Sequence, residues 1–365
     1  MNVPKLRFKE FNDEYVKLKY KDVLKIKSGK DQKQVEDENG KYPILGTGGQ
    51  IGKTNSFLYD KPSVLIGRKG TINKPQYMEL PFWTVDTLFY SRIYEPNIPK
   101  YLFYSFQNVN WKKYDESTGV PSLSSSTIES VECSIPSPNE QLKVAKFLSL
   151  LDKKIELQSK KIEDLKLFKK GLINHIIENI EIEKIPLKYI LVEQNNKTSK
   201  NNEYEILSST SKGIYLQKDY FNKQAASDNN VGYKILKKNQ LVLSPQNLWM
   251  GNINVNTEYN IGIVSPSYKI FNISNNVNID FFNYWIKSPK ALFEYKISSE
   301  QGASIVRRNL NMDLFYEIIV DVPRGKLQNK VGKIIKLLNL NIQYNEFLLQ
   351  KLSELKKGLM QNMFV

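Results

Sequence analysis

The sequence predicts an α+β protein: two mixed α/β globular domains and two long helices that pair as an antiparallel coiled coil, with a pseudo-two-fold internal duplication. Two segments with the same heptad spacing of apolar residues align without a gap, at the offset of 187 residues that separates Gln141 from Gln328. Each follows a stretch of about 140 residues rich in short β-type runs. The 365 residues, of which 41% are hydrophobic, suffice for two or three domains.

The first globular domain is expected over residues 1–137, with strands near 63–67 and 87–90. Within it, the glycine-rich residues 44–54 raise the alternative of a phosphate-binding loop. The Walker A spacing fails, because the residue five positions before Gly52 is Thr47 and no helical period follows. We therefore expect a strand followed by a polar turn.

The second globular domain is expected over residues 181–322, with strands near 240–244 and 268–271, and it looks like a distant copy of the first. Residues 42–45 match residues 204–207, after which Ser208, Ser209 and Thr210 replace the glycine-rich segment. A phosphate-binding loop would not have such a counterpart. Near the end of each domain, residues 119–123 match residues 302–306.

The long helices are expected over residues 138–180 and 323–365. A heptad seam must meet a partner helix, and the nearest candidate is the other copy. Two amides, Gln158 and Asn345, occupy equivalent central positions, and we expect them to face each other and fix the register. The predicted seam consists of Val144, Leu148, Leu151, Ile155, Gln158, Ile162 and Leu165, with counterparts Val331, Ile335, Leu338, Ile342, Asn345, Leu349 and Leu352.

The charge balance favours a polyanionic partner. Lys and Arg number 53 against 38 Asp and Glu, a formal net charge of +15, and basic side chains release counterions from nucleic-acid phosphates. A merely soluble basic protein is the alternative. One cysteine, Cys133, and one histidine, His175, exclude an internal disulfide and a zinc site of Cys/His type. With no apolar run near eighteen residues, we expect a cytoplasmic protein that does not bind membranes.

The order of globular domain, long helix, globular domain and long helix resembles the specificity subunit of type I restriction–modification systems. The resemblance covers essentially the whole chain and is carried by residues 3–8, 42–53, 62–72, 136–141 and 165–171. It implies two target recognition domains, each reading one half of a split DNA sequence, with the helices setting the gap. The implied partners are double-stranded DNA, two methyltransferase subunits docked on the helices, and motor-nuclease subunits.

In the first domain we expect Arg68 and Lys69 to read bases. The flanking glycines let the backbone approach a groove, and Arg bonds guanine bidentately. The alternative is a simple hairpin on which Arg68 is a surface charge. Thr71 and Asn73 follow on the same loop. Three lysines are expected to contact phosphates, and one tryptophan is expected in the core: Lys53, Lys112 and Lys113, and Trp111.

The second domain lacks the Gly-Arg-Lys-Gly turn and has residues 244–251 in its place, which we interpret as a different half-site. Gln246 and Asn247 suit adenine edges, whereas Trp249 is either a core aromatic or a wedge. Three residues that follow Gly302 are further candidates for base reading: Arg307, Arg308 and Asn309. For the two arginines the alternative is a solvated charge.

No catalytic set is present. The sequence lacks the Asn/Asp-Pro-Pro-aromatic tetrapeptide of adenine methyltransferases and a glycine-rich methyl-donor loop, and Asp86 and Asp115 lack the acidic neighbours of a nuclease site. We therefore predict a non-catalytic DNA-binding subunit without a cofactor or metal. The alternatives are a non-specific coiled-coil DNA scaffold and, less favoured, a P-loop NTPase or fused methyltransferase.

Overall fold

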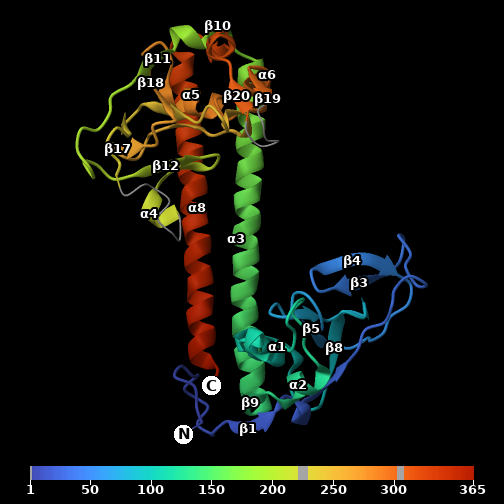
Figure 1. Ribbon diagram of the computed structural model, residues 1–365. Helices are drawn as coiled ribbons and strands as arrows, with labels where there is room; N and C mark the ends of the chain where they lie inside the picture. Colours follow the sequence, from blue (N-terminus) through green and yellow to red (C-terminus); the bar gives the residue numbers. More distant parts are fainter. Residues whose placement is uncertain (1, 221–228, 302–307) are drawn as a thin grey trace. The chain divides into compact units, whose positions relative to one another are not determined.

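The computed structural model describes residues 2–220, 229–301 and 308–365 (Figure 1). The chain divides into two compact units, unit 1 (Met1–Lys160 with Glu346–Val365) and unit 2 (Lys161–Asn345). Both divisions fall inside a long helix, α3 (Pro138–Glu178) or α8 (Leu327–Met363). Each unit therefore contains one globular part and a segment of each long helix.

Unit 1 is built on a four-stranded antiparallel sheet in the order β2-β8-β5-β6. Its central strand β5 (Ser63–Gly67) is buried along its whole length, with Val64 and Ile66 in one hydrophobic cluster and Leu65 in another. A run of β-branched and aliphatic residues suits a strand covered on both faces. The other elements are β1 (Val16–Lys19), η1 (Tyr20–Asp22), β2 (Leu24–Lys27), β3 (Tyr42–Gly46), β4 (Gly49–Thr54), β6 (Gln76–Met78), β7 (Trp83–Thr84), β8 (Leu88–Ile93), α1 (Pro99–Asn108), η2 (Trp111–Tyr114), α2 (Ser125–Ser130) and β9 (Glu132–Ile135).

Unit 2 contains a sheet of the same topology, in the order β11-β18-β15-β16. The strand that corresponds to β5 is β15 (Leu241–Leu243), where Leu241 and Leu243 share one cluster and Val242 belongs to another. The remaining elements are β10 (Ile182–Pro186), η3 (Leu187–Tyr189), β11 (Leu191–Gln194), β12 (Leu207–Thr210), β13 (Gly213–Leu216), α4 (Gln217–Tyr220), β14 (Lys234–Lys237), η4 (Leu248–Met250), β16 (Ile253–Val255), β17 (Ile261–Val264), β18 (Lys269–Ile273), α5 (Ile279–Trp285), α6 (Pro289–Ile297), β19 (Ser299–Gln301), β20 (Arg308–Leu310), α7 (Met312–Tyr316) and β21 (Ile319–Pro323).

The matching sheets confirm the predicted α+β class and the internal duplication. The strands that lead into the long helices match as well, since β1 pairs with β9 in unit 1 and β10 with β21 in unit 2, both antiparallel. The duplication therefore extends from the sheets to the helix starts.

The glycine-rich residues 44–54 form a hairpin, in which β3 pairs antiparallel with β4. A phosphate-binding loop leads directly into a helix, but the next element after Thr54 is strand β5. The turn begins later than the sequence suggests: Gly46 still pairs with Gly49. In unit 2 the expected polar turn at Ser208 was wrong, because Ser208 is part of strand β12 and pairs with Tyr215 of β13.

Equivalent glutamines anchor the two long helices. Gln141 Oε1 accepts a hydrogen bond from the backbone N–H of Ile98 (2.9 Å), and Gln328 Oε1 accepts one from that of Asn278 (2.8 Å). Ile98 and Asn278 are the N-cap residues of α1 and α5. In each unit, an equivalent glutamine therefore fastens the long helix to the short helix that comes directly after β8 or β18 of the sheet.

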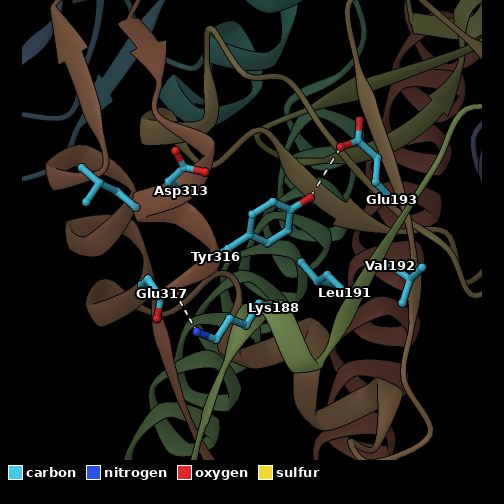
Figure 2. Close-up of a pocket in the computed structure, with 8 residues that line it drawn as sticks. Lys188, Leu191, Val192, Glu193, Asp313, Tyr316 and Glu317 are labelled. Carbon is cyan, nitrogen blue, oxygen red and sulfur yellow. Dashed lines mark hydrogen bonds and ion pairs between the residues drawn. The ribbon is translucent and has the colours of Figure 1, made fainter.

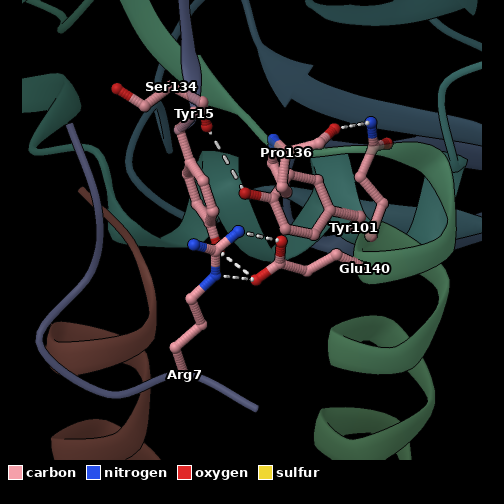
Figure 3. A network of polar contacts seen from close by, with 7 residues as sticks. Arg7, Tyr15, Tyr101, Ser134, Pro136 and Glu140 are labelled. Carbon is pink, nitrogen blue, oxygen red and sulfur yellow. Dashed lines mark hydrogen bonds and ion pairs between the residues drawn. The ribbon is translucent and has the colours of Figure 1, made fainter. Parts of the chain in front are cut away.

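Unit 1 adds a polar network at the start of α3 (Figure 3). The guanidinium of Arg7 donates to both carboxylate oxygens of Glu140, at 2.8 and 2.7 Å, and the hydroxyl of Tyr15 donates to the same carboxylate at 3.0 Å. The side chain of Glu140 is only 1% exposed. Hydrogen bonding to Glu140 raises the pKa of Arg7.

Segments of the two long helices run antiparallel within each unit. In unit 1, Lys356 forms an ion pair with Asp152, while Leu148, earlier in α3, shares a cluster with Met360, later in α8. In unit 2, Lys169 donates to Asn339 at 2.8 Å, and Ile173, later in α3, shares a cluster with Ile335, earlier in α8. The same register relates both contacts, because each pair of residue numbers adds to the same total.

The predicted seam residues are all buried or half-buried, whereas apolar residues off the seam, such as Leu150 and Leu167, are 69% and 71% exposed. Asn345 is 1% exposed, and its amide donates to the backbone carbonyl of Asn341 at 2.7 Å. Gln158 belongs to unit 1 and Asn345 to unit 2. That these two amides face each other stays a prediction.

Candidate nucleic-acid interface

In unit 1 the candidate base-reading loop follows the central strand β5 and is held by its own backbone. The N–H of Arg68 donates to the carbonyl of Thr87 at 2.8 Å, and the carbonyl of Arg68 accepts from the N–H of Leu123 at 2.9 Å. The N–H of Gly70 donates to the carbonyl of Pro121 at 2.8 Å. These bonds fix the main chain from two sides, while the side chains of Arg68 and Lys69 are exposed.

Both flanking glycines are required by this geometry. A Cβ on Gly67 would lie 2.3 Å from the carbonyl oxygen of Thr71, and Gly70 has φ +86°, a left-handed conformation that favours glycine. The Gly-Arg-Lys-Gly sequence therefore builds a tight, rigid turn that presents Arg68 and Lys69 at the end of a buried strand. Thr71 is half-buried and Asn73 exposed on the same loop.

Asp115 shapes the segment against which this loop packs. Its Oδ1 accepts hydrogen bonds from the backbone N–H groups of Ser122 (2.9 Å) and Ser117 (3.1 Å), and these bonds lower its pKa. Sequence reasoning considered Asp115 only as a catalytic acid and missed this role. The Asp-x-Ser pattern at 115–117 is the available signal, since Asp often bonds the N–H two residues on.

The remaining unit 1 candidates lie on other elements. Lys112 and Lys113 are exposed on η2, whose Trp111 is only 1% exposed in the core, as predicted. Lys53 is exposed on β4, at the opposite end of the strand from the β3–β4 turn. Asn73 lines a shallow pocket with Asn110 and Lys357. An open site with amides and lysines suits phosphate and base contacts.

In unit 2 the corresponding loop follows β15 and spans residues 244–252. Gln246 is exposed, Asn247 and Trp249 are half-buried, and Leu248 is fully buried as the anchor of the turn. The loop closes on itself, because the N–H of Ser244 donates to the carbonyl of Asn252 at 3.0 Å. It presents amide groups where unit 1 presents cations.

The structure brings Gln246 and Arg308 together, since the N–H of Arg308 donates to the carbonyl of Gln246 at 3.2 Å. The guanidinium of Arg308, however, donates to the hydroxyl (2.9 Å) and the carbonyl of Ser299, and to the carbonyl of Lys296. These internal bonds compete with base contact. Asn309 is exposed on β20, and Arg307 lies outside the described residues, as do residues 302–306.

One pocket of unit 2 has the wrong charge for DNA (Figure 2). Glu193, Asp313 and Glu317 line it, and its one lysine, Lys188, pairs with Glu317 at 2.8 Å. The hydroxyl of Tyr316 donates to Glu193 at 3.5 Å. Carboxylates repel phosphates, so this pocket is not part of the candidate interface.

Within the described residues, no three His, Cys, Asp or Glu side chains gather in a way that would hold a metal ion. None of the described helices combines the length and apolar character needed to cross a bilayer.

Residues 12–167 match the family model described as the type I restriction modification DNA specificity domain. The Type I restriction enzyme EcoDI specificity subunit of Escherichia coli is 26% identical over 150 residues, which are 40% of this chain and 32% of that protein. The matched part thus spans about a third of that relative's length.

Two solved structures share the fold. The S subunit of a type I restriction–modification system from M. genitalium matches with TM-score 0.67 at 17% identity, over 100% of this chain and 99% of that chain. A chain from a structure on complex assembly and conformational transition of a type I R-M system matches with TM-score 0.52 at 8% identity, over 95% and 96%. The predicted resemblance to type I specificity subunits is confirmed.

Proposed function

We propose that this chain is the sequence-specific DNA-binding subunit of a type I restriction–modification complex, and that each unit reads one half of a bipartite DNA target. One observation carries the proposal: the two units place different side chains at the end of the same central strand. Arg68 and Lys69 follow β5, whereas Gln246 and Asn247 follow β15. A duplicated scaffold with divergent loops is what recognition of an asymmetric sequence requires.

The chemistry of the loops supports direct readout. An exposed Arg on a tight turn suits the O6 and N7 acceptors of guanine, and the amides of the exposed Gln246 and the half-buried Asn247 suit the N6 and N7 groups of adenine. The net charge of +15 supplies the sequence-independent attraction to phosphates. Lys53, Lys112 and Lys113, on other elements than the loop, are proposed to contribute to that attraction.

The helices are proposed to set the distance between half-sites and to dock two methyltransferase subunits. Exposed apolar residues at matching positions of the two copies support two similar docking sites, for example Leu150 with Leu337 and Leu157 with Tyr344. In this arrangement the chain contributes no catalytic group, and methyl transfer and cleavage belong to the methyltransferase and motor-nuclease subunits. A cytoplasmic location follows from the same proposal.

Selection of DNA from a random pool by the full chain, alone and with its methyltransferase subunits, tests this function. The wild-type protein is expected to enrich two short motifs at a constant separation. Arg68→Ala should relax one motif and Gln246→Ala the other, each by roughly 5- to 150-fold, because one bidentate contact gives roughly 1–3 kcal/mol of discrimination. A coiled-coil scaffold without specificity would enrich no motif.

Lys113→Ala is the matched control for the charge lost in Arg68→Ala. If Lys113 contacts phosphate, this variant weakens binding to all sequences alike and lowers the salt slope by about 1. Arg68→Ala acting in the same uniform way would show that Arg68 is a phosphate contact, and the readout role proposed for it would be wrong.

A further inference from the structure

A lysine outside the loops links two segments of unit 2, the 244–252 loop and the turn between β12 and β13. Lys287 follows α5, and its Nζ donates to the carbonyl of Gly251 at 2.7 Å and to that of Ser211 at 3.1 Å. Gly251 closes the 244–252 loop, and Ser211 is in the turn between β12 and β13. One ammonium therefore joins two segments that are 40 residues apart in sequence, from Ser211 to Gly251.

Each bond is charge-assisted, and hydrogen bonds from an ionised donor are roughly twice as strong as neutral ones. The side chain is half-buried, and this burial lowers the pKa of Lys287 to about 8. Keeping an ammonium partly out of water is unfavourable unless its hydrogen bonds are supplied by the protein. Here two main-chain carbonyls from different segments supply them.

A buried amide network supports the same turn from below. The amide of Asn254 on β16 donates to the carbonyl of Thr210 (2.8 Å) and to the hydroxyl of Ser209 (2.7 Å), and that hydroxyl donates to Asn252 (2.8 Å). Asn254 and Ser209 are 5% and 3% exposed. The β12–β13 turn is thus bonded to β16 and to Asn252, the last residue of the loop.

Unit 1 holds its hairpin with an equivalent amide, but no lysine stands at the position of Lys287. There the amide of Gln76 on β6 donates to the carbonyls of Gly46 (2.9 Å) and Thr47 (3.3 Å), which corresponds to the role of Asn254. Ile98 of unit 1 corresponds to Asn278 of unit 2, because each donates to the anchoring glutamine of its long helix. Lys287 comes nine residues after Asn278, and the residue at the same distance after Ile98 is Gln107. Gln107 is exposed and accepts a hydrogen bond from Lys356 of α8. The lysine link is therefore a feature of unit 2.

We propose that Lys287 is a positioning residue for DNA recognition: it clamps the 244–252 loop to the β12–β13 turn and thereby sets the half-site that unit 2 selects. This rests on the proposed function of that loop. Lys287 acts through the loop, and its aliphatic stem and ammonium are committed to the protein. Loss of the clamp removes the cation that joins the carbonyls of Gly251 and Ser211 and allows the loop to sample other conformations.

The test compares Lys287→Met with Lys290→Met in the full chain. Both substitutions remove one positive charge, but Lys290 is 50% exposed and forms an ion pair with Asp321 of β21. Lys287→Met is expected to lower discrimination within one half-site by about tenfold, which corresponds to about 1.4 kcal/mol, and to leave the other half-site unchanged. Lys290→Met should select the wild-type sequences.

Amide hydrogen exchange provides the second readout, and it does not depend on DNA. In Lys287→Met, peptides covering 210–213 and 245–252 should exchange faster, while peptides of unit 1 keep their wild-type rates. Should Lys287→Met not fold, Lys287→Gln, which is too short to reach both carbonyls, is measured in the same way. A wild-type protein that enriches no motif would refute the function proposed above, whereas the exchange data would still test the clamp.

Unchanged half-site selection together with unchanged exchange in Lys287→Met overturns the clamp. Equal loss at both half-sites also overturns it, because that result indicates a general loss of folding or of charge. Faster exchange with unchanged selection shows that the lysine orders the loop without setting the half-site, and it overturns the positioning role.

Discussion

The two anchoring glutamines should contribute unequally to the free energy of unfolding, because water has different access to their hydrogen-bond partners. Gln141 is 1% exposed, and besides its bond from Ile98 its amide donates to the carbonyl of the buried Pro136 at 3.0 Å. Gln328 makes the matching bond from Asn278, but its amide donates to the exposed carbonyl of Asn276 at 3.1 Å. Water can replace the second partner at Gln328 but not at Gln141.

Gln141→Ala leaves two backbone groups without partners where water has little access, and each costs roughly 1–3 kcal/mol. We expect a loss of about 2–6 kcal/mol in unit 1. Gln328→Ala should cost about 1 kcal/mol in unit 2, because a hydrogen bond that water can replace contributes about that much. Gln350→Ala, whose side chain is exposed on α8, is the control and should cost about 0.5 kcal/mol or less.

Amide hydrogen exchange of peptides covering 98–108 and 278–286 measures each unit separately, and urea unfolding gives the total. Gln141→Ala should speed exchange in 98–108, and Gln328→Ala in 278–286. An equal or larger cost at Gln328 would refute the argument from burial. Faster exchange in the other unit would refute the idea that each glutamine fastens its own helix.

Three further predictions follow from unit 1. Burial raises the pKa of Cys133 to about 12, so at pH 8.5 its alkylation should be about a thousandfold slower than that of a model thiol and should reach the model rate in urea. Glu140→Gln leaves the guanidinium of Arg7, 14% exposed, without its counter-ion and should cost about 3 kcal/mol in urea unfolding, whereas Glu10→Gln, at an exposed ion pair, should cost less than about 1 kcal/mol. Gly67→Ala should cost at least about 1–3 kcal/mol and relax one half-site, whereas Gly48→Ala, where a Cβ meets nothing within 4 Å, should leave selection unchanged.

The sequence predicts the features that depend on periodicity and repetition. The gapless alignment that pairs Gln141 with Gln328 predicts the duplication. The heptad spacing distinguishes Leu148, which is buried, from Leu150, which is 69% exposed. Such patterns are local, because a helix places every third or fourth residue on one face. The helices and the class of fold could therefore be inferred before the structure.

The contacts of the candidate sites could not be inferred in the same way, since they join residues far apart in sequence. The charge of Arg308 predicts a base-reading side chain, yet its guanidinium bonds Ser299 on the neighbouring strand. Lys287 is one of 53 basic residues, and nothing in its sequence neighbourhood indicates that it lies against Gly251, 36 residues away. Only the tertiary fold distinguishes a cation that is exposed and able to contact DNA from one that is bonded within the protein.

The two units should therefore tolerate amino-acid substitutions differently. The loop of unit 1 is held by main-chain bonds of Arg68 and Gly70, which any side chain except proline at position 68 or 69 would leave in place. The loop of unit 2 depends on side chains elsewhere, Lys287 and Asn254, that bond its end and the neighbouring turn. Substitutions at positions 68 and 69 should therefore change the selected sequence without loss of order, while unit 2 can lose its selectivity through residues that touch no DNA. Substitutions in the loop of unit 1 are expected to replace one selected half-site sequence by another. Substitutions at Lys287 or Asn254 are expected to lower the discrimination within the half-site of unit 2.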